Sequence, residues 1–283
     1  MQAHPEKKKP RWLLALGREE PPAEIELSSG RYRLARIFKH DFFAFTARYA
    51  ALEEGADDVV LKIGRKAWFF LLPLGFIGRL HAWHESRVFE QLQDLEVVPR
   101  FTGRWEKHGL THAFVKGHEL RKGDPVPDDF FERLERGLAA IHARDMAYVD
   151  LEKPENVLLG EDGRPYLFDF QIAWSWPRKA GGRLPPIVWM QRSFQRSDRY
   201  HLEKLKRRVR PDLMTAEELE ASRLRPAHVR WYNRMTRPFT RLRRRVLNRI
   251  DPEKRRGERG RVHPPERGAL TEGTEAARAR RGS

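Results

Sequence analysis

The sequence predicts an α+β protein built as two lobes, the first rich in β-strands and the second mostly helical. Strand-like segments, one helix and further strand-like segments are followed by a half with helical spacing, an order typical of α+β proteins. The chain has 283 residues, 40% of them apolar. That is enough apolar material for one large domain or for two lobes that share a cleft.

The β-rich half begins with three segments that are rich in aromatic and β-branched residues and are separated by turn signals: Tyr32–Phe38, Phe42–Leu52 and Asp58–Ile63. A helix is predicted over 80–95, because apolar residues recur there at steps of three and four. A second pair of strands is then expected at Val97–Trp105 and Leu110–Val115.

The second half is expected to start with a helix that Asp128 or Asp129 caps and that runs to about Arg144. A short hairpin, Val157–Leu159 with Tyr166–Phe168, follows, and beyond residue 190 the spacing is helical and basic. The predicted organisation is a basic leader, a β-rich lobe, a helical lobe and a disordered tail, at 1–30, 31–112, 113–250 and 251–283.

The composition of the chain excludes some kinds of site and favours others. Cysteine is absent, which excludes disulfides, cysteine-ligated metals and a thiol nucleophile. Lysine and arginine outnumber aspartate and glutamate by 56 to 40, and the net charge of +16 favours a polyanionic partner. Since no apolar run reaches the roughly 18 residues that span a bilayer, we expect a cytoplasmic protein, or one bound peripherally at the inner leaflet of the cytoplasmic membrane.

The most informative stretch runs from Tyr148 to Leu159 and contains Asp150-Leu-Glu-Lys-Pro-Glu-Asn156. Asp169 follows thirteen residues after Asn156, within Phe168-Asp-Phe-Gln171. Two acids and an amide at the ends of short strands suit chemistry on a magnesium nucleotide, because Mg²⁺ prefers oxygen ligands and takes several from substrate phosphates. A further carboxylate can orient an attacking hydroxyl and accept its proton.

These residues resemble the protein-kinase-like superfamily, whose catalytic loop reads His-Arg-Asp-Leu-x-x-x-Asn and whose metal motif is Asp-Phe-Gly. The resemblance implies a two-lobed kinase-like fold that uses ATP and Mg²⁺. It implies that Asp150 is the catalytic base, Asn156 a magnesium ligand and Asp169 the principal magnesium ligand. His142, eight residues before Asp150, is expected to be a buried support of the loop.

Other parts of the kinase pattern lie in the β-rich half. Lys62 ends the strand Val59-Val-Leu-Lys-Ile63, which resembles the Val-Ala-Ile-Lys motif. Alternation places Val60 and Lys62 on one face, where Lys62 would hold the nucleotide's phosphates and Val60 would cover its base. Glu85 is the expected helix partner of Lys62, with Glu90 as the alternative.

The departures from the pattern are also informative. Between Tyr32 and Leu52 there is no glycine, so the Gly-rich phosphate loop is missing and the expected turn is Lys39–Ala44. Tyr148-Val149 replaces His-Arg, one extra residue separates Asp150 from Asn156, and Gln171 replaces the metal-motif glycine. No Ala-Pro-Glu follows Asp169. The chain is therefore similar to bacterial lipopolysaccharide core sugar kinases and RIO-type atypical kinases, which have a reduced C-terminal lobe.

Two further stretches suggest where the protein works. Residues 68–78 are apolar but too short to cross a bilayer, and either pack on the first lobe or enter a membrane interface. The arginines of 223–249 are interleaved with aromatic residues and either cover a helix or bind anionic lipid. Together they could form a surface that faces an anionic membrane.

The leading hypothesis is an ATP-dependent phosphotransferase, a kinase acting on a hydroxyl of a sugar or glycolipid. The first alternative is an atypical Ser/Thr protein kinase of RIO-like kind, with a protein acceptor. The second is a pseudokinase scaffold, which the absent glycines and Gln171 favour and the retained Asp150, Asn156 and Asp169 oppose. A nucleic-acid partner is not expected, because it leaves the acidic motif unexplained.

Overall fold

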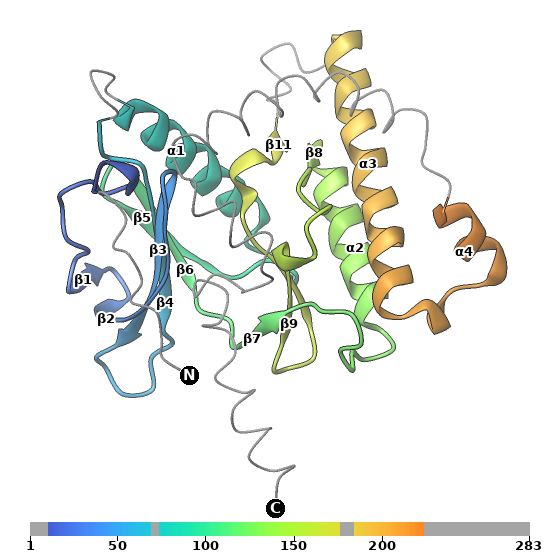
Figure 1. The fold of residues 1–283 in the computed structure, drawn as a ribbon, viewed down its shortest axis with the longest axis horizontal. Helices are drawn as coiled ribbons and strands as arrows, with labels where there is room; N and C mark the ends of the chain where they lie inside the picture. Colours follow the sequence, from blue (N-terminus) through green and yellow to red (C-terminus); the bar gives the residue numbers. More distant parts are fainter. Residues whose placement is uncertain (1–10, 69–73, 176–183, 224–283) are drawn as a thin grey trace, which may run out of the picture. The chain divides into compact units, whose positions relative to one another are not determined.

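The computed structural model describes residues 11–68, 74–175 and 184–223, which divide into two compact units (Figure 1). The described part of the first unit is 11–68, 74–86 and 102–114. The second is 87–101, 115–175 and 184–223. The predicted disordered tail, and all of the arginine segment except Arg223, lie outside the described residues. Within the described residues, no helix has the length and hydropathy needed to cross a membrane.

The first unit is built on a six-stranded sheet of order β1-β2-β3-β4-β6-β5, whose first five strands pair antiparallel. Its strands are β1 (Glu24–Leu27), β2 (Gly30–His40), β3 (Ala44–Ala51), β4 (Val59–Gly64), β5 (Phe101–Trp105) and β6 (Gly109–Ala113). The three strands predicted within 31–63 are therefore present. The strand predicted at Val97–Trp105 is shorter, because Pro99 has no N–H to donate to a ladder and Val98 already closes a turn onto Leu95.

One face of this sheet carries the core of the unit. Val59, Leu61 and Ile63 alternate along β4 and are buried in one cluster with Phe45 and Tyr49 of β3. Lys62 points to the opposite face, where α1 (Gly75–Leu92) contributes its partner Glu85. The predicted alternation along β4 is thus confirmed.

Part of the segment predicted as a leader belongs to the sheet. Leu16 and Ile25 are buried in the core cluster, and β1 pairs with β2. The Tyr49 hydroxyl donates to the Pro22 carbonyl at 2.7 Å, and burial raises the pKa of this tyrosine. The sequence does not predict this strand, because β1 has only four residues and lies in a basic, proline-containing segment.

Arg65 fastens this N-terminal segment to the end of β4. Its guanidinium donates to main-chain carbonyls of three segments: Trp12 and Leu14 at 3.0 and 3.5 Å, Phe42 at 2.8 Å and Trp68 at 3.1 Å. It also stacks 3.9 Å from the Phe42 ring. Because the side chain is buried, these carbonyls replace the water that an exposed guanidinium would bind.

Helix α1 begins five residues before the predicted start at residue 80, and two glycines explain its close approach to β4. A Cβ atom on Gly78 would lie 2.1 Å from the Arg65 carbonyl oxygen, and one on Gly64 would lie 2.6 Å from the Gly78 oxygen. Only hydrogen in both places lets the backbones meet. This contact sets the distance between the helix that carries Glu85 and the strand that carries Lys62.

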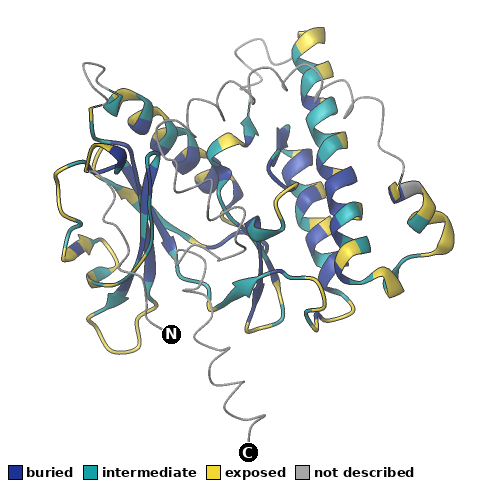
Figure 2. Ribbon diagram, in the orientation of Figure 1, coloured by how far each residue is buried: buried dark blue, intermediate teal, exposed yellow. Residues whose placement is uncertain are grey.

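The second unit is mostly helical, with α2 (Phe130–Ala143), α3 (Pro185–Val209) and α4 (Ala216–Arg223). Its short strands form two small sheets, β10-β9-β7 and β11-β8, from β7 (Gly117–Glu119), β8 (Met146–Ala147), β9 (Val157–Gly160), β10 (Pro165–Leu167) and β11 (Trp174–Ser175). The β9–β10 pair is the predicted hairpin. Buried residues occur along both α2 and α3 (Figure 2), and the two helices contact each other.

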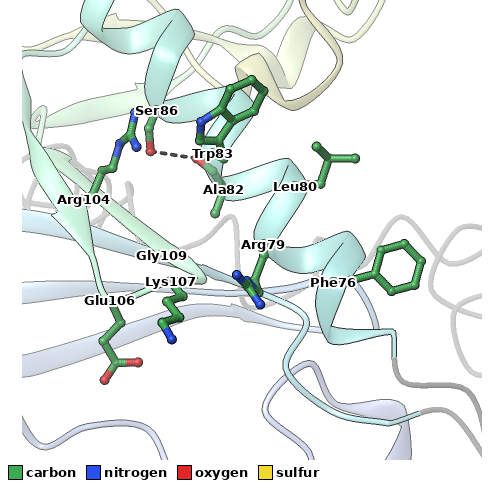
Figure 3. A pocket seen from close by; sticks show the side chains of 10 residues that line it. All are labelled: Phe76, Arg79, Leu80, Ala82, Trp83, Ser86, Arg104, Glu106, Lys107 and Gly109. Atoms are coloured by element: carbon green, nitrogen blue, oxygen red, sulfur yellow. Dashed lines mark hydrogen bonds between the residues drawn. The ribbon is translucent and has the colours of Figure 1, made fainter.

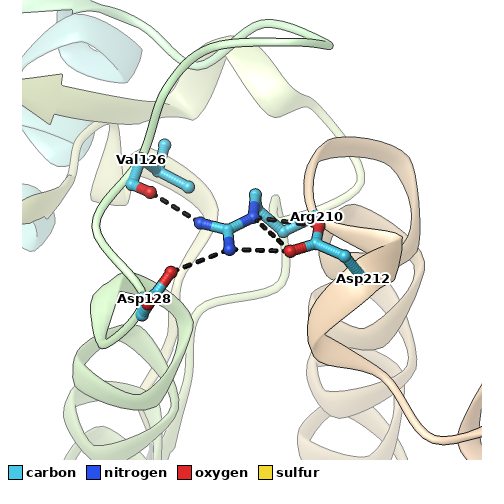
Figure 4. Close-up of polar contacts among 4 residues, drawn as sticks. All are labelled: Val126, Asp128, Arg210 and Asp212. Carbon is cyan, nitrogen blue, oxygen red and sulfur yellow. Dashed lines mark hydrogen bonds and ion pairs between the residues drawn. The ribbon is translucent and has the colours of Figure 1, made fainter.

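The start of α2 is held by charged side chains rather than by the predicted cap. Asp129 occupies the N-cap position but its side chain makes no capping hydrogen bond. Its carboxylate instead accepts from Arg133 at 2.6 Å, one turn into the helix. Arg210, at the end of α3, ties that end to the residues before α2 by donating to the Val126 carbonyl at 2.7 Å and to Asp128 at 2.8 Å (Figure 4).

Candidate active site

Lys62 and Glu85 form a buried ion pair in the first unit. The lysine Nζ lies 2.8 Å from Glu85 Oε1, and the two side chains are 15% and 3% exposed. The predicted contact is therefore confirmed, and the alternative partner Glu90 is exposed. Removing either partner would leave an unpaired buried charge, so each fixes the other in place.

Val60 and His112 lie beside Lys62 on the same face of the sheet. Val60 is buried and pairs directly with His112 of β6. The His112 Nδ1 is 2.9 Å from the Ala113 carbonyl oxygen. Burial lowers the pKa of His112 to about 4; its hydrogen bond to Ala113 opposes the decrease, and the Lys62 charge adds to it. His112 is therefore neutral at neutral pH.

This neutral histidine predicts an acid-sensitive fold. Between pH 6.5 and 4 the unfolded chain protonates His112 while the folded chain does not, so the free energy of unfolding falls as the pH is lowered. From pH 7 to pH 5 the expected loss is about 2 kcal/mol, from about 1.4 kcal/mol per pKa unit. His112→Asn should remove that part of the loss in urea denaturation. An identical pH dependence in both proteins would contradict the assignment.

The turn that stands where a Gly-rich loop would lie is closed on itself. The Asp41 carboxylate accepts from the backbone amides of Phe43 and Ala44 at 2.8 and 3.0 Å, and Asp41 is buried. Backbone amides of this kind are the groups that bind phosphate in a glycine-rich loop. Here a carboxylate of the chain itself occupies them, so phosphate binding must come from other groups.

The second unit gathers the predicted loop residues around Asp150. Asn156 Nδ2 donates to Asp150 Oδ2 at 2.9 Å and to the Asp150 carbonyl at 3.1 Å. The ammonium of Lys153 lies 2.5 Å from the same Oδ2. Asp150 and Asn156 are buried, whereas the Lys153 side chain is 53% exposed. The extra residue between Asp150 and Asn156 therefore does not separate them.

Asp169 is the first residue of the turn that follows β10 and has left-handed backbone angles, φ 58 and ψ 63. Aspartate tolerates this conformation better than most residues. The adjacent Phe170 is fully buried, and its ring meets Tyr148 at 5.3 Å and Phe89 at 5.1 Å. The Tyr148 hydroxyl donates to the Phe168 carbonyl. Tyr148, which stands where the kinase motif has a histidine, thus joins the Asp150 loop to the Asp169 turn.

Asp198 of α3 holds the loop that precedes Asp150. One carboxylate oxygen accepts from the Val149 amide at 2.8 Å, and the other accepts from the Tyr148 amide at 2.8 Å and pairs with His142 at 3.0 Å. Val149 has φ 71, a costly conformation for a β-branched residue, on the order of 1–3 kcal/mol. Since Asp198 is fully buried, its bonds offset that strain. His142 is the buried support that the sequence predicts.

Asp198→Asn is expected to lower the free energy of unfolding by about 2–4 kcal/mol, because an amide nitrogen would face N–H donors where a carboxylate oxygen accepted them. The Asp150 loop would also lose its anchor. Chemical denaturation measures the loss of stability. Asp212→Asn, an exposed aspartate beyond the same helix, is the matched control and should change stability little. Equal stability of the two variants would contradict the role given to Asp198.

The predicted magnesium ligands suit a hard cation. Both hydrogen bonds of Asn156 Nδ2 go to Asp150, which leaves the amide oxygen of Asn156 as an available ligand. Asp169 adds a half-buried carboxylate. Among the described residues no cluster of three or more acidic, histidine or cysteine side chains could hold a metal. Two protein oxygens completed by nucleotide phosphates are the usual arrangement for Mg²⁺, so the donor set fits a magnesium nucleotide.

Sequence reasoning missed Lys153 and Asp198 of the second unit and Arg65 of the first. Lys153 lies three positions after Asp150, and this spacing of opposite charges could have indicated an ion pair between them. Asp198 lies in a helix that is rich in basic residues, so the sequence suggests a solvent-exposed acid at this position. Arg65 follows the lysine strand, and nothing in the sequence distinguishes it from the chain's many other arginines.

Comparisons with known proteins point to kinases. The chain is 31% identical over 134 residues to serine/threonine-protein kinase 16 of Mus musculus, covering 47% of this chain and 32% of the kinase. It is 27% identical over 155 residues to CBL-interacting serine/threonine-protein kinase 19 of Arabidopsis thaliana, covering 51% and 30%. A probable casein kinase I homolog of Encephalitozoon cuniculi is 26% identical over 121 residues, covering 39% and 38%.

A solved structure is also similar: the Rio2 kinase of Chaetomium thermophilum, as an ADP/Mg²⁺–phosphoaspartate complex, with TM-score 0.48, 16% identity, and coverage of 66% of this chain and 60% of that one. No family model matches the chain. The chain spans about a third of the length of the curated relatives above. The kinase relatives found by sequence confirm the predicted resemblance to the protein-kinase-like superfamily, and the described residues form the predicted α+β arrangement of strands and helices.

Proposed function

We propose that this chain is an ATP-dependent phosphotransferase that transfers the γ-phosphoryl group to a hydroxyl. The observation that carries the proposal is the Asp150 cluster, in which a buried carboxylate is held by Asn156 and Lys153. A scaffold that only binds a partner has no need of this arrangement. The kinase relatives found by sequence support the same reaction class.

Each predicted residue then has a defined task. Asp150 orients the acceptor hydroxyl and takes its proton as the oxygen attacks phosphorus and the bond to the ADP oxygen breaks. Lys62, fixed by Glu85, holds the nucleotide's phosphates, and Val60 covers the base. Asn156 and Asp169 bind Mg²⁺, which supplies charge stabilisation for the phosphoryl group. Because Asp41 occupies the turn amides, phosphate affinity rests on Lys62 and the metal ligands.

For the acceptor we propose a sugar or glycolipid hydroxyl, as in lipopolysaccharide kinases. The sequence supports this, since it has no Ala-Pro-Glu after Asp169 and its charge of +16 would attract phosphorylated glycans. The second candidate is a serine or threonine of a protein, in a RIO-like kinase. It is favoured by the relatives, whose names describe serine/threonine-protein kinases. A pseudokinase scaffold is the third, and the self-closed Asp41 turn favours it.

One assay separates these candidates. The purified full chain is incubated with γ-labelled ATP and Mg²⁺, with and without a cell-envelope extract and with a mixture of generic protein substrates. Label in the glycolipid fraction is the expected result, whereas label in protein would select the protein kinase. Absence of any transfer and of any ATP hydrolysis, with nucleotide binding intact by calorimetry, would select the pseudokinase and overturn the proposed activity.

A further inference from the structure

An exposed apolar ridge runs along the first part of α1. Phe76, Leu80 and Trp83 are 63%, 56% and 46% exposed. Their spacing of four and three residues places them on one face of the helix. Three large apolar side chains grouped in this way on a water-facing helix mark an interaction surface rather than the scattered exposure that most proteins show.

Cations lie to one side of this ridge. Between α1 and the β5–β6 hairpin lies a cavity of about 670 Å³, whose lining includes the ridge together with Arg79, Arg104 and Lys107. Glu106 also lines it, but its carboxylate is paired with Lys66 at 2.9 Å. Among the residues that the structure describes, Arg79 and Lys107 form no ion pair. The lining is thus apolar with an excess of positive charge.

The positive potential has an effect on a neighbouring side chain. The pKa of His108 is lowered, first by burial and then by the charges of Lys66 and Arg79. Figure 3 shows Phe76 and Leu80 projecting from α1 on the side away from Arg104, while Arg79 is directed toward the turn that carries Lys107. Apolar side chains therefore face outward, and cations lie beside them.

We propose that this α1 surface, formed by Phe76, Leu80, Trp83, Arg79, Arg104 and Lys107, docks the protein on an anionic lipid bilayer. Tryptophan is favoured at the depth of the headgroups, phenylalanine and leucine are typical of the apolar face of an interfacial helix, and lysine and arginine are attracted to anionic lipid. A helix with an apolar face flanked by cations lies in the plane of such an interface. The membrane-facing surface predicted from the sequence relied on the arginines of 223–249 for its positive charge, whereas the α1 surface has cations of its own.

A bilayer fits this surface better than a peptide does. Phe76 and Leu80 project outward instead of forming the walls of a closed groove (Figure 3), and a fluid acyl layer can surround projecting side chains from all sides. A peptide strand or helix would cover only one side of each. The proposal stands apart from phosphoryl transfer, since docking requires neither nucleotide nor acceptor.

The test uses the full chain and vesicle co-sedimentation with phosphatidylserine–phosphatidylcholine vesicles, against pure phosphatidylcholine, at low and high salt. The wild-type protein is expected to bind the anionic vesicles in a salt-sensitive way. Arg79→Gln with Lys107→Gln should weaken binding by about 25-fold at low salt, roughly fivefold per charge. Phe76→Ser with Leu80→Ser should weaken it by at least about tenfold.

Two matched double variants are the controls, Ile37→Ser with Leu52→Ser for exposed apolar groups and Arg31→Gln with Lys122→Gln for exposed cations. They should bind like the wild type, and thermal melting should show that all variants fold. Trp83→Phe should reduce fluorescence quenching by brominated lipid. No binding to anionic vesicles at low salt, or binding that the α1 variants leave unchanged, would overturn the proposal. So would capture of an acidic amphipathic peptide by a protein that ignores vesicles.

Discussion

Replacing Asp169 with alanine is expected to abolish Mg²⁺-dependent nucleotide turnover while the protein still folds. The carboxylate lies at the turn after β10, and it is the principal charged oxygen proposed to hold the metal. Without it, the charge that develops on the transferring phosphoryl group loses its stabilisation, and the rate should fall by more than about 10³. The fold should persist because the buried contacts of Phe170 and Tyr148 are unchanged.

The left-handed backbone at Asp169 calls for a second variant. Alanine at φ 58 costs roughly 1 kcal/mol, whereas asparagine adopts this conformation easily. Asp169→Asn should therefore match the wild-type melting temperature and still be inactive, which separates the charge from the backbone. Glu161→Ala, an exposed acid on the same hairpin, is the control and should keep full turnover. Undiminished ATP turnover in both Asp169 variants would remove the kinase interpretation.

The residues of the candidate site could be found from the sequence because they occur in short, local patterns. Asp150 and Asn156 lie six residues apart, and a strand of alternating residues shows which face Lys62 occupies. The kinase resemblance pointed to Glu85, with Glu90 as the alternative, and the 2.8 Å contact agrees with Glu85. Strands with strong β-branched content, such as β3 and β4, were found for the same reason.

The parts that the sequence did not reveal depend on contacts between distant residues. β1 is too short and too polar to show a period, and it exists because β2 offers it an edge. Asp198 is separated from Val149 by almost fifty residues, and Arg65 binds carbonyls from residues 12–14. No local pattern marks such a partner, because its role is set by the fold that brings the segments together. The closure of the turn at Asp41 likewise depends on its backbone geometry.

Asp150→Asn is the variant that distinguishes chemistry from binding. Asparagine has the same shape as aspartate. Its side-chain oxygen can still accept the hydrogen bond that Asn156 Nδ2 donates to Asp150 Oδ2 at 2.9 Å in the wild-type protein. The loop and the metal ligand should therefore stay in place. What the variant removes is the ability to take a proton, so phosphoryl transfer should fall by about 10²–10⁴. Nucleotide affinity and Mg²⁺ dependence should stay near the wild-type values, since both rest on Lys62, Asn156 and Asp169.

Lys153 sharpens the interpretation of that experiment. Its ammonium is paired with Asp150 but half exposed, so losing the partner charge leaves it solvated and should cost little stability. A fall in stability in Asp150→Asn would mean that the carboxylate is structural. Glu152→Gln removes the same charge from an exposed neighbour in the loop and should leave the transfer rate unchanged. Loss of nucleotide binding by Asp150→Asn, with a normal rate for each bound complex, would assign Asp150 to binding and leave the proton without its acceptor.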